Sequence, residues 1–186
     1  MGKTQYYTAT SFDGYIADED NSLDWLFQVE PDGAGDDQFK EFFGEVGAFA
    51  MGATTYEWVH AHEDEFKWRD YYGETPCWVF THRDLPRIPG ATLNFVQGDV
   101  RPVHEELTAA AQGKNIWLVG GGELVGNFAD HGLLDEIILA VAPVTLGGGA
   151  PLLPRRLMPS RLRLVRLEQS GQFAHLTYAV RTPTTG

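Results

Sequence analysis

Residues 116–128 read Ile116-Trp117-Leu118-Val119-Gly120-Gly121-Gly122-Glu123-Leu124-Val125-Gly126-Asn127-Phe128. The first four residues are apolar and rich in β-formers. After the three glycines the apolar side chains recur at helical spacing, at Leu124, Val125 and Phe128. The pattern predicts a strand, a glycine turn and a helix, in that order.

A run of three glycines is typical of a place where another molecule comes close to the backbone. Glycine loses much conformational entropy on folding, so it is useful where the main chain needs unusual dihedral angles or close contact. The first N–H groups of the following helix lack partners and lie at the positive end of its dipole, which favours a bound anion such as a phosphate. The alternative is a tight turn whose glycines only allow the strand and the helix to pack closely.

Two well-known phosphate-binding loops do not match this stretch. A P-loop requires Gly-Lys-Ser/Thr at the start of the helix, whereas Gly122 is followed by Glu123 and Leu124. A Rossmann fingerprint belongs to an opening βαβ unit with an acidic residue about twenty positions later, whereas this run comes late in the chain. The P-loop is excluded, whereas Gly120, Gly122 and Gly126 have a Rossmann-like spacing but the wrong place in the chain.

Length and charge limit the fold and the partners. A chain of 186 residues without a linker, a repeat or a low-complexity tract is expected to form one domain, residues 1–186. The formal net charge is −12, from 26 acidic residues against 14 Lys and Arg. Nucleic acid and anionic membrane surfaces are therefore disfavoured as partners, although a local site can still hold a small anion.

Cysteine content and the start of the chain bear on the compartment. Cys77 is the only cysteine, so an internal disulfide cannot form. Residues 1–5 contain no apolar signal region, and no apolar run approaches the length of a membrane span. We expect a cytoplasmic protein with no membrane partner.

Two further strands are expected to end in polar or glycine-containing junctions. Residues 48–51 are continuously apolar and run into Gly52, after which a helix is predicted with Thr54 or Thr55 as its cap or as a hydroxyl donor. Residues 77–80 run into Thr81, His82 and Arg83. Ligands of α/β sheets bind at the carboxyl ends of strands, so these junctions and the glycine run are expected to meet at one site. Hydroxyls, an Arg and a glycine turn suit an elongated, phosphorylated ligand.

The last third of the chain differs from the rest. Residues 161–167 alternate polar and apolar side chains, and residues 175–180 follow across Gly171. This pattern predicts an antiparallel hairpin with one wetted face. The predicted fold is therefore α/β, with a mixed, mostly parallel sheet flanked by helices and a C-terminal antiparallel hairpin.

Five segments, in order, resemble the dihydrofolate reductase-like fold and, within it, the reductase domain of bacterial riboflavin biosynthesis with its stand-alone relatives. The resemblance covers nearly the whole chain. The matching segments are Ser11–Ala17, Met51–Glu57, Val79–Arg83, Val119–Leu124 and Pro143–Leu152.

The resemblance implies a reductase that transfers a hydride from NADPH to a small polar heterocycle or a ribosylamino-pyrimidine, as in 5-amino-6-(5-phosphoribosylamino)uracil reductases. One alternative is reduction of dihydrofolate or another pterin, although no counterpart of the Arg that holds the folate glutamate tail is found. Another is a nucleotide-binding module without catalytic activity. A homodimer is also expected.

The resemblance also implies cofactor-binding residues. Ala9, Ile16 and Ala17 would present backbone atoms to the nicotinamide, and Thr81 and Arg83 would meet the adenosine end with any 2′-phosphate. The family usually has an Arg at the position of Ala53, which leaves the choice between NADPH and NADH open. A cis peptide between Gly120 and Gly121 is implied. The residues expected to contact the pyrophosphate are Gly52, Thr54, Thr55, Gly120, Gly121, Gly122, Glu123 and Leu124.

The catalytic acid has several candidates. Asp36 falls where true dihydrofolate reductases carry their substrate carboxylate, and a plain helix N-cap is the alternative for it. Asp13 is a second catalytic candidate and is also typical of a turn. The substrate side is expected to include Asp24, Trp25, Thr145 and Gly147. His60 and His62 lie close in sequence, but without a third ligand nearby we interpret them as part of a solvated helix end and expect no metal site.

Overall fold

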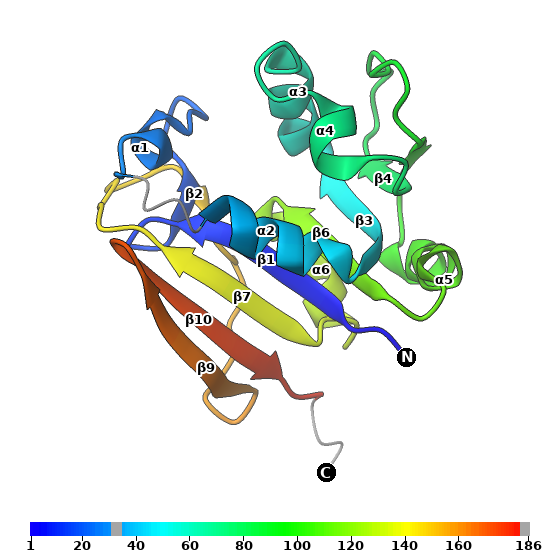
Figure 1. The fold of residues 1–186 in the computed structure, drawn as a ribbon. Helices are drawn as coiled ribbons and strands as arrows, with labels where there is room; N and C mark the ends of the chain where they lie inside the picture. Colours follow the sequence, from blue (N-terminus) through cyan, green and yellow to red (C-terminus); the bar gives the residue numbers. More distant parts are fainter. Residues whose placement is uncertain (31–34, 183–186) are drawn as a thin grey trace.

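In a computed structural model, which describes residues 1–30 and 35–182, the chain is built around one eight-stranded sheet (Figure 1). The strand order is β5-β4-β3-β6-β1-β7-β10-β9, and the first six are parallel to one another. β10 and β9 form the antiparallel hairpin at one edge. The strands are β1 Thr4–Thr10, β3 Val46–Gly52, β4 Cys77–Phe80, β5 Leu93–Val96, β6 Asn115–Gly120, β7 Glu136–Val141, β9 Leu162–Ser170 and β10 Phe173–Val180. The predicted fold class is confirmed.

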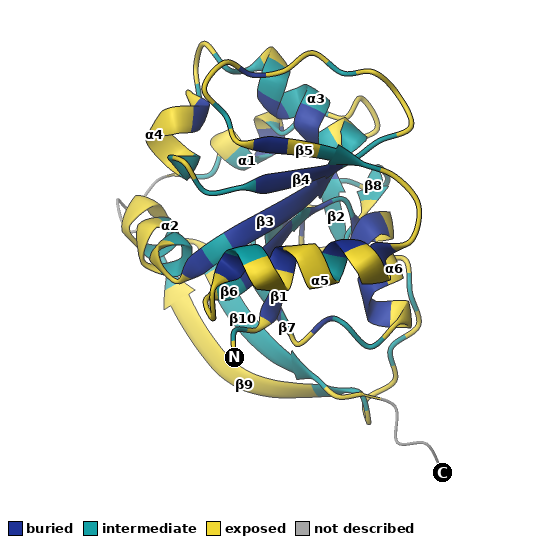
Figure 2. Ribbon diagram, turned by 90° about the vertical axis from the view of Figure 1, so that its right-hand side faces the viewer, coloured by how far each residue is buried: buried dark blue, intermediate teal, exposed yellow. Residues whose placement is uncertain are grey.

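Helices cover both faces of the sheet, because its central strands are apolar on both sides. One buried cluster joins Ala48, Ala50 and Leu118 of the sheet to helices α5 and α6, and the other joins Phe49, Met51 and Trp117 to α3 and α4. Burying both faces removes large apolar areas from water. Figure 2 shows the central strands dark blue between these layers. The helices are α1 Asp24–Phe27, α2 Gly35–Gly44, α3 Ala53–Ala61, α4 Trp68–Tyr72, α5 Val100–Ala111 and α6 Gly122–Asp130.

The three predicted junctions lie together at the carboxyl edge of the sheet. In the strand register Met51 of β3 is opposite Gly120 of β6, and Gly52 is opposite Phe80 of β4. The ends of β3, β4 and β6 are therefore adjacent, and α3 and α6 begin directly after β3 and β6. Parallel strands bring their carboxyl ends to one edge, which is why three junctions far apart in sequence meet here.

Some elements differ from the sequence prediction. α3 has Gly52 as its N-cap, with no side-chain capping bond, so Thr54 and Thr55 lie in the first turn instead of capping it. The sequence predicts a helix over residues 102–112, with Pro102 near its start and Gly113 just past its end. α5 instead begins at Val100, because the Asp99 carboxylate, at the N-cap, accepts a hydrogen bond from the Arg101 N–H. The short elements α4, β2 (Tyr15–Ala17) and β8 (Ala150–Pro151) were not predicted. β2 and β8 pair only with each other, a long-range contact that no local pattern encodes.

Membrane insertion can be judged from helix length and polarity. Across residues 1–30 and 35–182, the structure contains no helix with both the length and the apolar character required to span a bilayer.

Candidate functional site

A cavity of about 560 Å³ opens at the carboxyl edge of the sheet, where the three junctions meet. Its wall includes ten of the residues predicted to bind the cofactor, and it adds Trp58 and the segment around Pro151. We call it the junction cavity. It is lined by Thr8, Ala9, Ile16, Ala17, Asn21, Leu23, Leu26, Gly52, Ala53, Thr54, Thr55, Trp58, Val119, Gly121, Gly122, Glu123, Leu124, Ala150, Pro151 and Pro154.

The three consecutive glycines have three different structural roles. Gly120 has φ +140°, a backbone conformation that side chains rarely adopt, and its peptide bond to Gly121 is cis, as the resemblance implied. A Cβ on Gly121 would meet only the Ile16 side chain, at 3.9 Å, and both residues line the junction cavity. A Cβ on Gly122 would lie 2.5 Å from the carbonyl oxygen of Leu152. The packing interpretation therefore holds for Gly122, whereas Gly121 leaves space at the cavity.

Two helices begin at the wall of the junction cavity. The first turn of α3 consists of Ala53, Thr54 and Thr55, and this turn contains no acidic residue. Gly122, Glu123 and Leu124 form the first turn of α6. First-turn N–H groups have no acceptor within their own helix, so both helix starts present donors and positive dipole ends to one cavity. This arrangement favours a ligand with two linked anionic groups.

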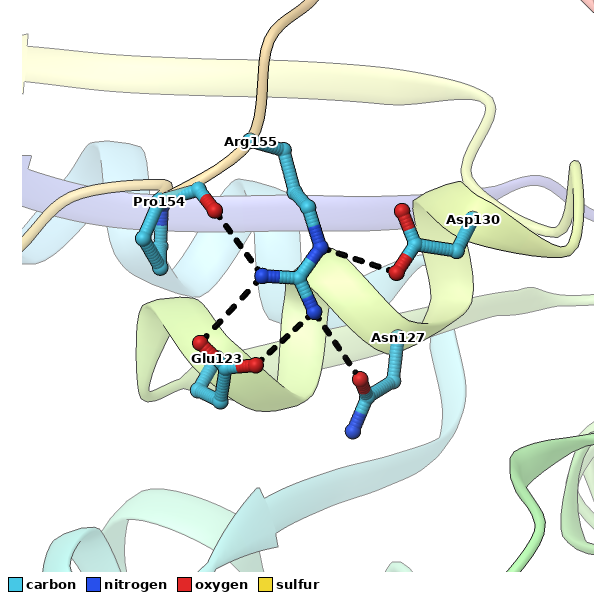
Figure 3. Close-up of polar contacts among 5 residues, drawn as sticks. All are labelled: Glu123, Asn127, Asp130, Pro154 and Arg155. Carbon is cyan, nitrogen blue, oxygen red and sulfur yellow. Dashed lines mark hydrogen bonds and ion pairs between the residues drawn. The ribbon is translucent and has the colours of Figure 1, made fainter.

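Glu123 places a carboxylate at one of these helix starts, and Arg155 binds it there (Figure 3). The Arg155 guanidinium donates to both Glu123 carboxylate oxygens, at 2.8 and 3.2 Å, and its Nε donates to Asp130 at 2.8 Å. It also donates to the Pro154 carbonyl oxygen at 2.8 Å and to the Asn127 side chain at 3.0 Å. The hydrogen bonds that Glu123 accepts from Arg155 lower the pKa of the Glu123 carboxyl group. Arg155 thus joins the segment after β8 to α6 and opposes the charge of Glu123.

Thr81 and Arg83 lie beyond the wall of the junction cavity. The Arg83 guanidinium forms a two-pronged ion pair with Glu57 of α3, at 2.7 and 2.9 Å. The Thr81 hydroxyl accepts a hydrogen bond from the Arg83 N–H at 3.0 Å. Both residues follow the end of β4, which lies next to the end of β3.

A second cavity, of about 520 Å³, lies beside the first. We call it the inner cavity. It shares Ala9 of β1 and Leu26 of α1 with the junction cavity, so the two cavities are adjacent at these two residues. Its wall combines aromatic side chains with a few polar groups. It is lined by Tyr7, Ala9, Leu26, Phe27, Val29, Gly35, Asp36, Gln38, Ala140, Ser170, Phe173 and His175.

The two candidate acids have different surroundings. Asp36, in the first turn of α2, lines the inner cavity. The Asp13 carboxylate instead accepts hydrogen bonds from the N–H groups of Leu146 and Gly147, at 3.0 and 2.8 Å, and from the Ser11 hydroxyl at 2.7 Å. These bonds, that from Leu146 first, lower the pKa of Asp13. Asp13 lines neither cavity, so the structure assigns it to holding the turn at residues 143–149.

The four residues predicted for the substrate side lie outside both cavities. Trp25 is buried and its indole N–H donates to the Ser22 carbonyl oxygen at 3.2 Å, so it supports α1 from inside. Asp24 is exposed at the start of α1. Thr145 and Gly147 are exposed, and the Gly147 N–H is bound to Asp13. The neighbouring residues Leu26 and Phe27 line the inner cavity in their place.

Comparison with known proteins assigns the chain to a family. Residues 71–176 match the model of the RibD C-terminal domain. The chain belongs to the RibD C-terminal domain family. A relative from Bacillus subtilis, the uncharacterized protein YwjB, is 36% identical over 176 residues, which are 95% of this chain and 97% of that protein.

Solved structures agree with this assignment. A putative riboflavin biosynthesis protein from Shewanella sp. PV-4 is 26% identical with a TM-score of 0.78, covering 97% of this chain and 99% of that one. A deaminase/5-amino-6-(5-phosphoribosylamino)uracil reductase from Thermotoga maritima shares the fold at 15% identity and TM-score 0.67, over 97% of this chain and 57% of that one. A dihydrofolate reductase from Enterococcus faecalis, complexed with NADP(H), shares it at 14% identity and TM-score 0.60, over 97% of both chains. The RibD C-terminal domain family member described here has a dihydrofolate reductase-like fold.

Sequence reasoning missed most of the inner cavity. Phe173, Ser170 and His175 come from the C-terminal hairpin, which was predicted as a structural element only. β10 pairs with β7 in the register His175 to Ala140, and these two residues line the inner cavity together with Tyr7 of β1 and Asp36 of α2. The alternating pattern signalled a hairpin, but nothing local in it indicated a cavity wall.

Proposed function

We propose that this RibD C-terminal domain family member is an NADPH-dependent reductase of a small heterocyclic substrate related to a pyrimidine. One observation carries the proposal: the junction cavity and the inner cavity meet at Ala9 and Leu26. Hydride transfer requires a cofactor and a substrate in contact across a water-poor boundary. Two cavities that share a wall of apolar side chains meet this requirement.

The residues of the junction cavity fit a dinucleotide. The starts of α3 and α6 offer donors to a pyrophosphate, and the absence of a side chain at Gly121 leaves space beside them. The nicotinamide end would then lie against Ala9, Ile16 and Ala17, and the adenosine end would extend toward Thr81 and Arg83. When bound, NADPH would supply the hydride.

The residues of the inner cavity would act on the substrate. Asp36 would hold an N–H of the heterocycle and keep the reacting carbon facing Ala9. A carbon that accepts a hydride leaves its neighbouring nitrogen or oxygen in need of a proton, and a water molecule bound to the Asp36 carboxylate would deliver that proton. Leu26 and Phe27 would exclude bulk water from the contact between the two ligands.

A second candidate function is nucleotide binding without catalysis. It is supported by Ala53, which stands where the family usually has an Arg for the cofactor phosphate, at the wall of the junction cavity. A binding module predicts the same occupancy of the junction cavity but no turnover. Dihydrofolate reduction is a weaker alternative, because the described lining of the inner cavity includes no Arg for a carboxylate tail.

The test combines binding with turnover. Thermal unfolding with NADPH or NADH tests the junction cavity, since a ligand at 100 times its dissociation constant stabilises a protein by about 2.7 kcal/mol. NADPH absorbance is then followed with a panel of aminopyrimidines and pterins, including dihydrofolate. Stabilisation by NADPH with turnover of an aminopyrimidine supports the proposal. Stabilisation without any turnover supports the binding module, and faster turnover of dihydrofolate supports the folate alternative.

A further inference from the structure

We infer that the substrate of this chain is a flat heterocycle rich in hydrogen-bond donors and free of phosphate and carboxylate groups. The inference rests on the proposed function, because it concerns the ligand that would occupy the inner cavity. It narrows that function, since it separates this chain from reductases whose substrate carries a phosphate.

The charge of the inner cavity carries the first step. Among its described lining residues Asp36 is the only Asp, Glu, Lys or Arg side chain. The start of α2 could otherwise attract an anion, but its first turn carries both Asp36 and Asp37. Burial raises the pKa of Tyr7, so its phenol stays uncharged at neutral pH. His175 contributes an imidazole to the wall, but the described lining holds no Lys or Arg. A phosphate or carboxylate entering this cavity would therefore lose water and meet the like charge of Asp36 without an ammonium or guanidinium group to offset either cost.

The hydrogen-bonding groups carry the second step. The Gln38 side-chain oxygen is buried and, within residues 1–30 and 35–182, has no hydrogen-bond partner. Gln38 and Asp36 both line the inner cavity. An unpartnered buried acceptor is costly, and a carboxylate accepts hydrogen bonds only, so both groups favour a ligand that donates from ring N–H or amino groups.

The shape of the wall carries the third step. Tyr7, Phe27 and Phe173 contribute aromatic rings to a cavity that also contains Ala9, Val29 and Ala140. Small residues beside aromatic ones leave a space bounded by apolar surfaces, which suits a flat ring that stacks or packs edge-on. The polar atoms that orient it are few.

Two cations of neighbouring elements, Arg166 and Lys40, do not line the inner cavity. Arg166 of β9 forms an exposed ion pair with Glu168 at 2.8 Å. Lys40 lies one turn after Asp36 on α2, and with Asp36, Phe39 and Tyr71 it lines a separate surface hollow. A phosphate inside the inner cavity would therefore have neither of these cations on its wall.

The experiment compares matched ligands that differ in one anionic group. Protein saturated with NADP⁺ is titrated, by calorimetry, with 5-amino-6-(ribosylamino)uracil and its 5′-phosphate, and separately with 2,4-diaminopyrimidine and its 6-carboxylate. We expect the ligand without the anionic group to bind at least tenfold more tightly in each pair. Equal or tighter binding of the phosphate or of the carboxylate would overturn the inference, as would failure of both ligands without an anionic group to bind. NADP⁺ binding is measured first, so loss of the proposed function is seen separately.

Variants identify the source of the discrimination. Asp36→Asn should bring the dissociation constants of the two members of each pair closer together. Gln38→Leu should raise the dissociation constant of 2,4-diaminopyrimidine about fivefold while leaving NADP⁺ binding unchanged. Lys40→Gln is the matched control, because it changes a charge on α2 outside the inner cavity. If Lys40→Gln lowers the affinity for the phosphorylated ligand, a phosphate site exists there and the inference is wrong.

Discussion

Arg155 forms a two-pronged ion pair with Glu123, with N···O distances of 2.8 and 3.2 Å, at the start of the helix that borders the junction cavity. The Glu123 side chain is 72% exposed, whereas that of Arg155 is only 20% exposed. The guanidinium also lies over Gly126, where a Cβ would come within 2.6 Å of it. The negative charge of Glu123 would otherwise weaken the attraction of this helix start for a phosphate, and the positive charge of Arg155 offsets that effect.

The first prediction follows from that pair. Arg155→Met keeps much of the side-chain volume but leaves Glu123 unopposed, so we expect NADPH affinity to fall roughly three- to tenfold at low salt, with less effect at high salt. Glu123→Gln added to Arg155→Met should restore most of the affinity, measured by fluorescence titration. If the double variant binds as weakly as Arg155→Met alone, Arg155 acts by packing and not by charge.

The second prediction separates Gly121 from Gly122. Gly121→Val places its side chain in the junction cavity, so we expect a folded protein with NADPH binding reduced by at least a hundredfold. Gly122→Val is the matched control, since its Cβ would clash with the Leu152 carbonyl oxygen at 2.5 Å and should destabilise the fold. Circular dichroism and thermal shift with NADPH measure both effects. Unchanged cofactor affinity in folded Gly121→Val would place the pyrophosphate elsewhere.

The third prediction concerns the choice between NADPH and NADH. If Arg83 meets a 2′-phosphate, NADPH should stabilise the protein against heat more than NADH does, and Arg83→Ala should shrink that difference. Glu57 holds the Arg83 guanidinium at 2.7 Å, so Glu57→Gln should release it and enlarge the preference for NADPH. Equal thermal shifts with the two cofactors in the wild type would contradict this role.

The fourth prediction uses the lowered pKa of Asp13. Its folded pKa lies below the unfolded value of about 4, so the carboxylate stabilises the fold fully above that pH and loses the effect as pH falls through the folded pKa. Asp13→Asn should therefore lower the melting temperature at pH 7, and the difference from wild type should shrink below about pH 4. A difference that is constant from pH 7 to pH 3 would show that the charge is irrelevant.

The fifth prediction concerns the expected homodimer. Leu164 and Leu167 of the edge strand β9 are 48% and 64% exposed, and exposed apolar edge strands are prone to pair with another chain. We expect sedimentation equilibrium to give a dimer, and the double change Leu164→Lys and Leu167→Lys to give a monomer. Phe12→Lys, which also charges an exposed apolar residue, should leave the dimer intact. A wild-type monomer at high concentration would contradict the expectation.

The sequence by itself determined the central strands and the edge of the sheet at which they meet. Continuous apolar runs at residues 48–51, 77–80 and 116–119 indicated buried parallel strands, and Gly52 and Gly120 mark where β3 and β6 end. The carboxyl ends of parallel strands share an edge, so these local signals were sufficient to predict that the junctions meet there, whereas Ala9, Ile16 and Ala17 of the junction cavity were implied only by the family resemblance.

Tertiary structure alone decided which polar groups are available to a ligand. Asp13, Asp36 and Glu123 are all acidic residues in turns or first helical turns, and their local sequences do not distinguish them. Asp13 is bound by the N–H groups of a turn more than 130 positions later, and Glu123 is bound by Arg155 across 32 positions. Asp36 lines the inner cavity together with residues of the C-terminal hairpin, which reaches this cavity because β10 pairs with β7. These partners come from sheet register and chain crossing, which a local pattern of residues does not encode.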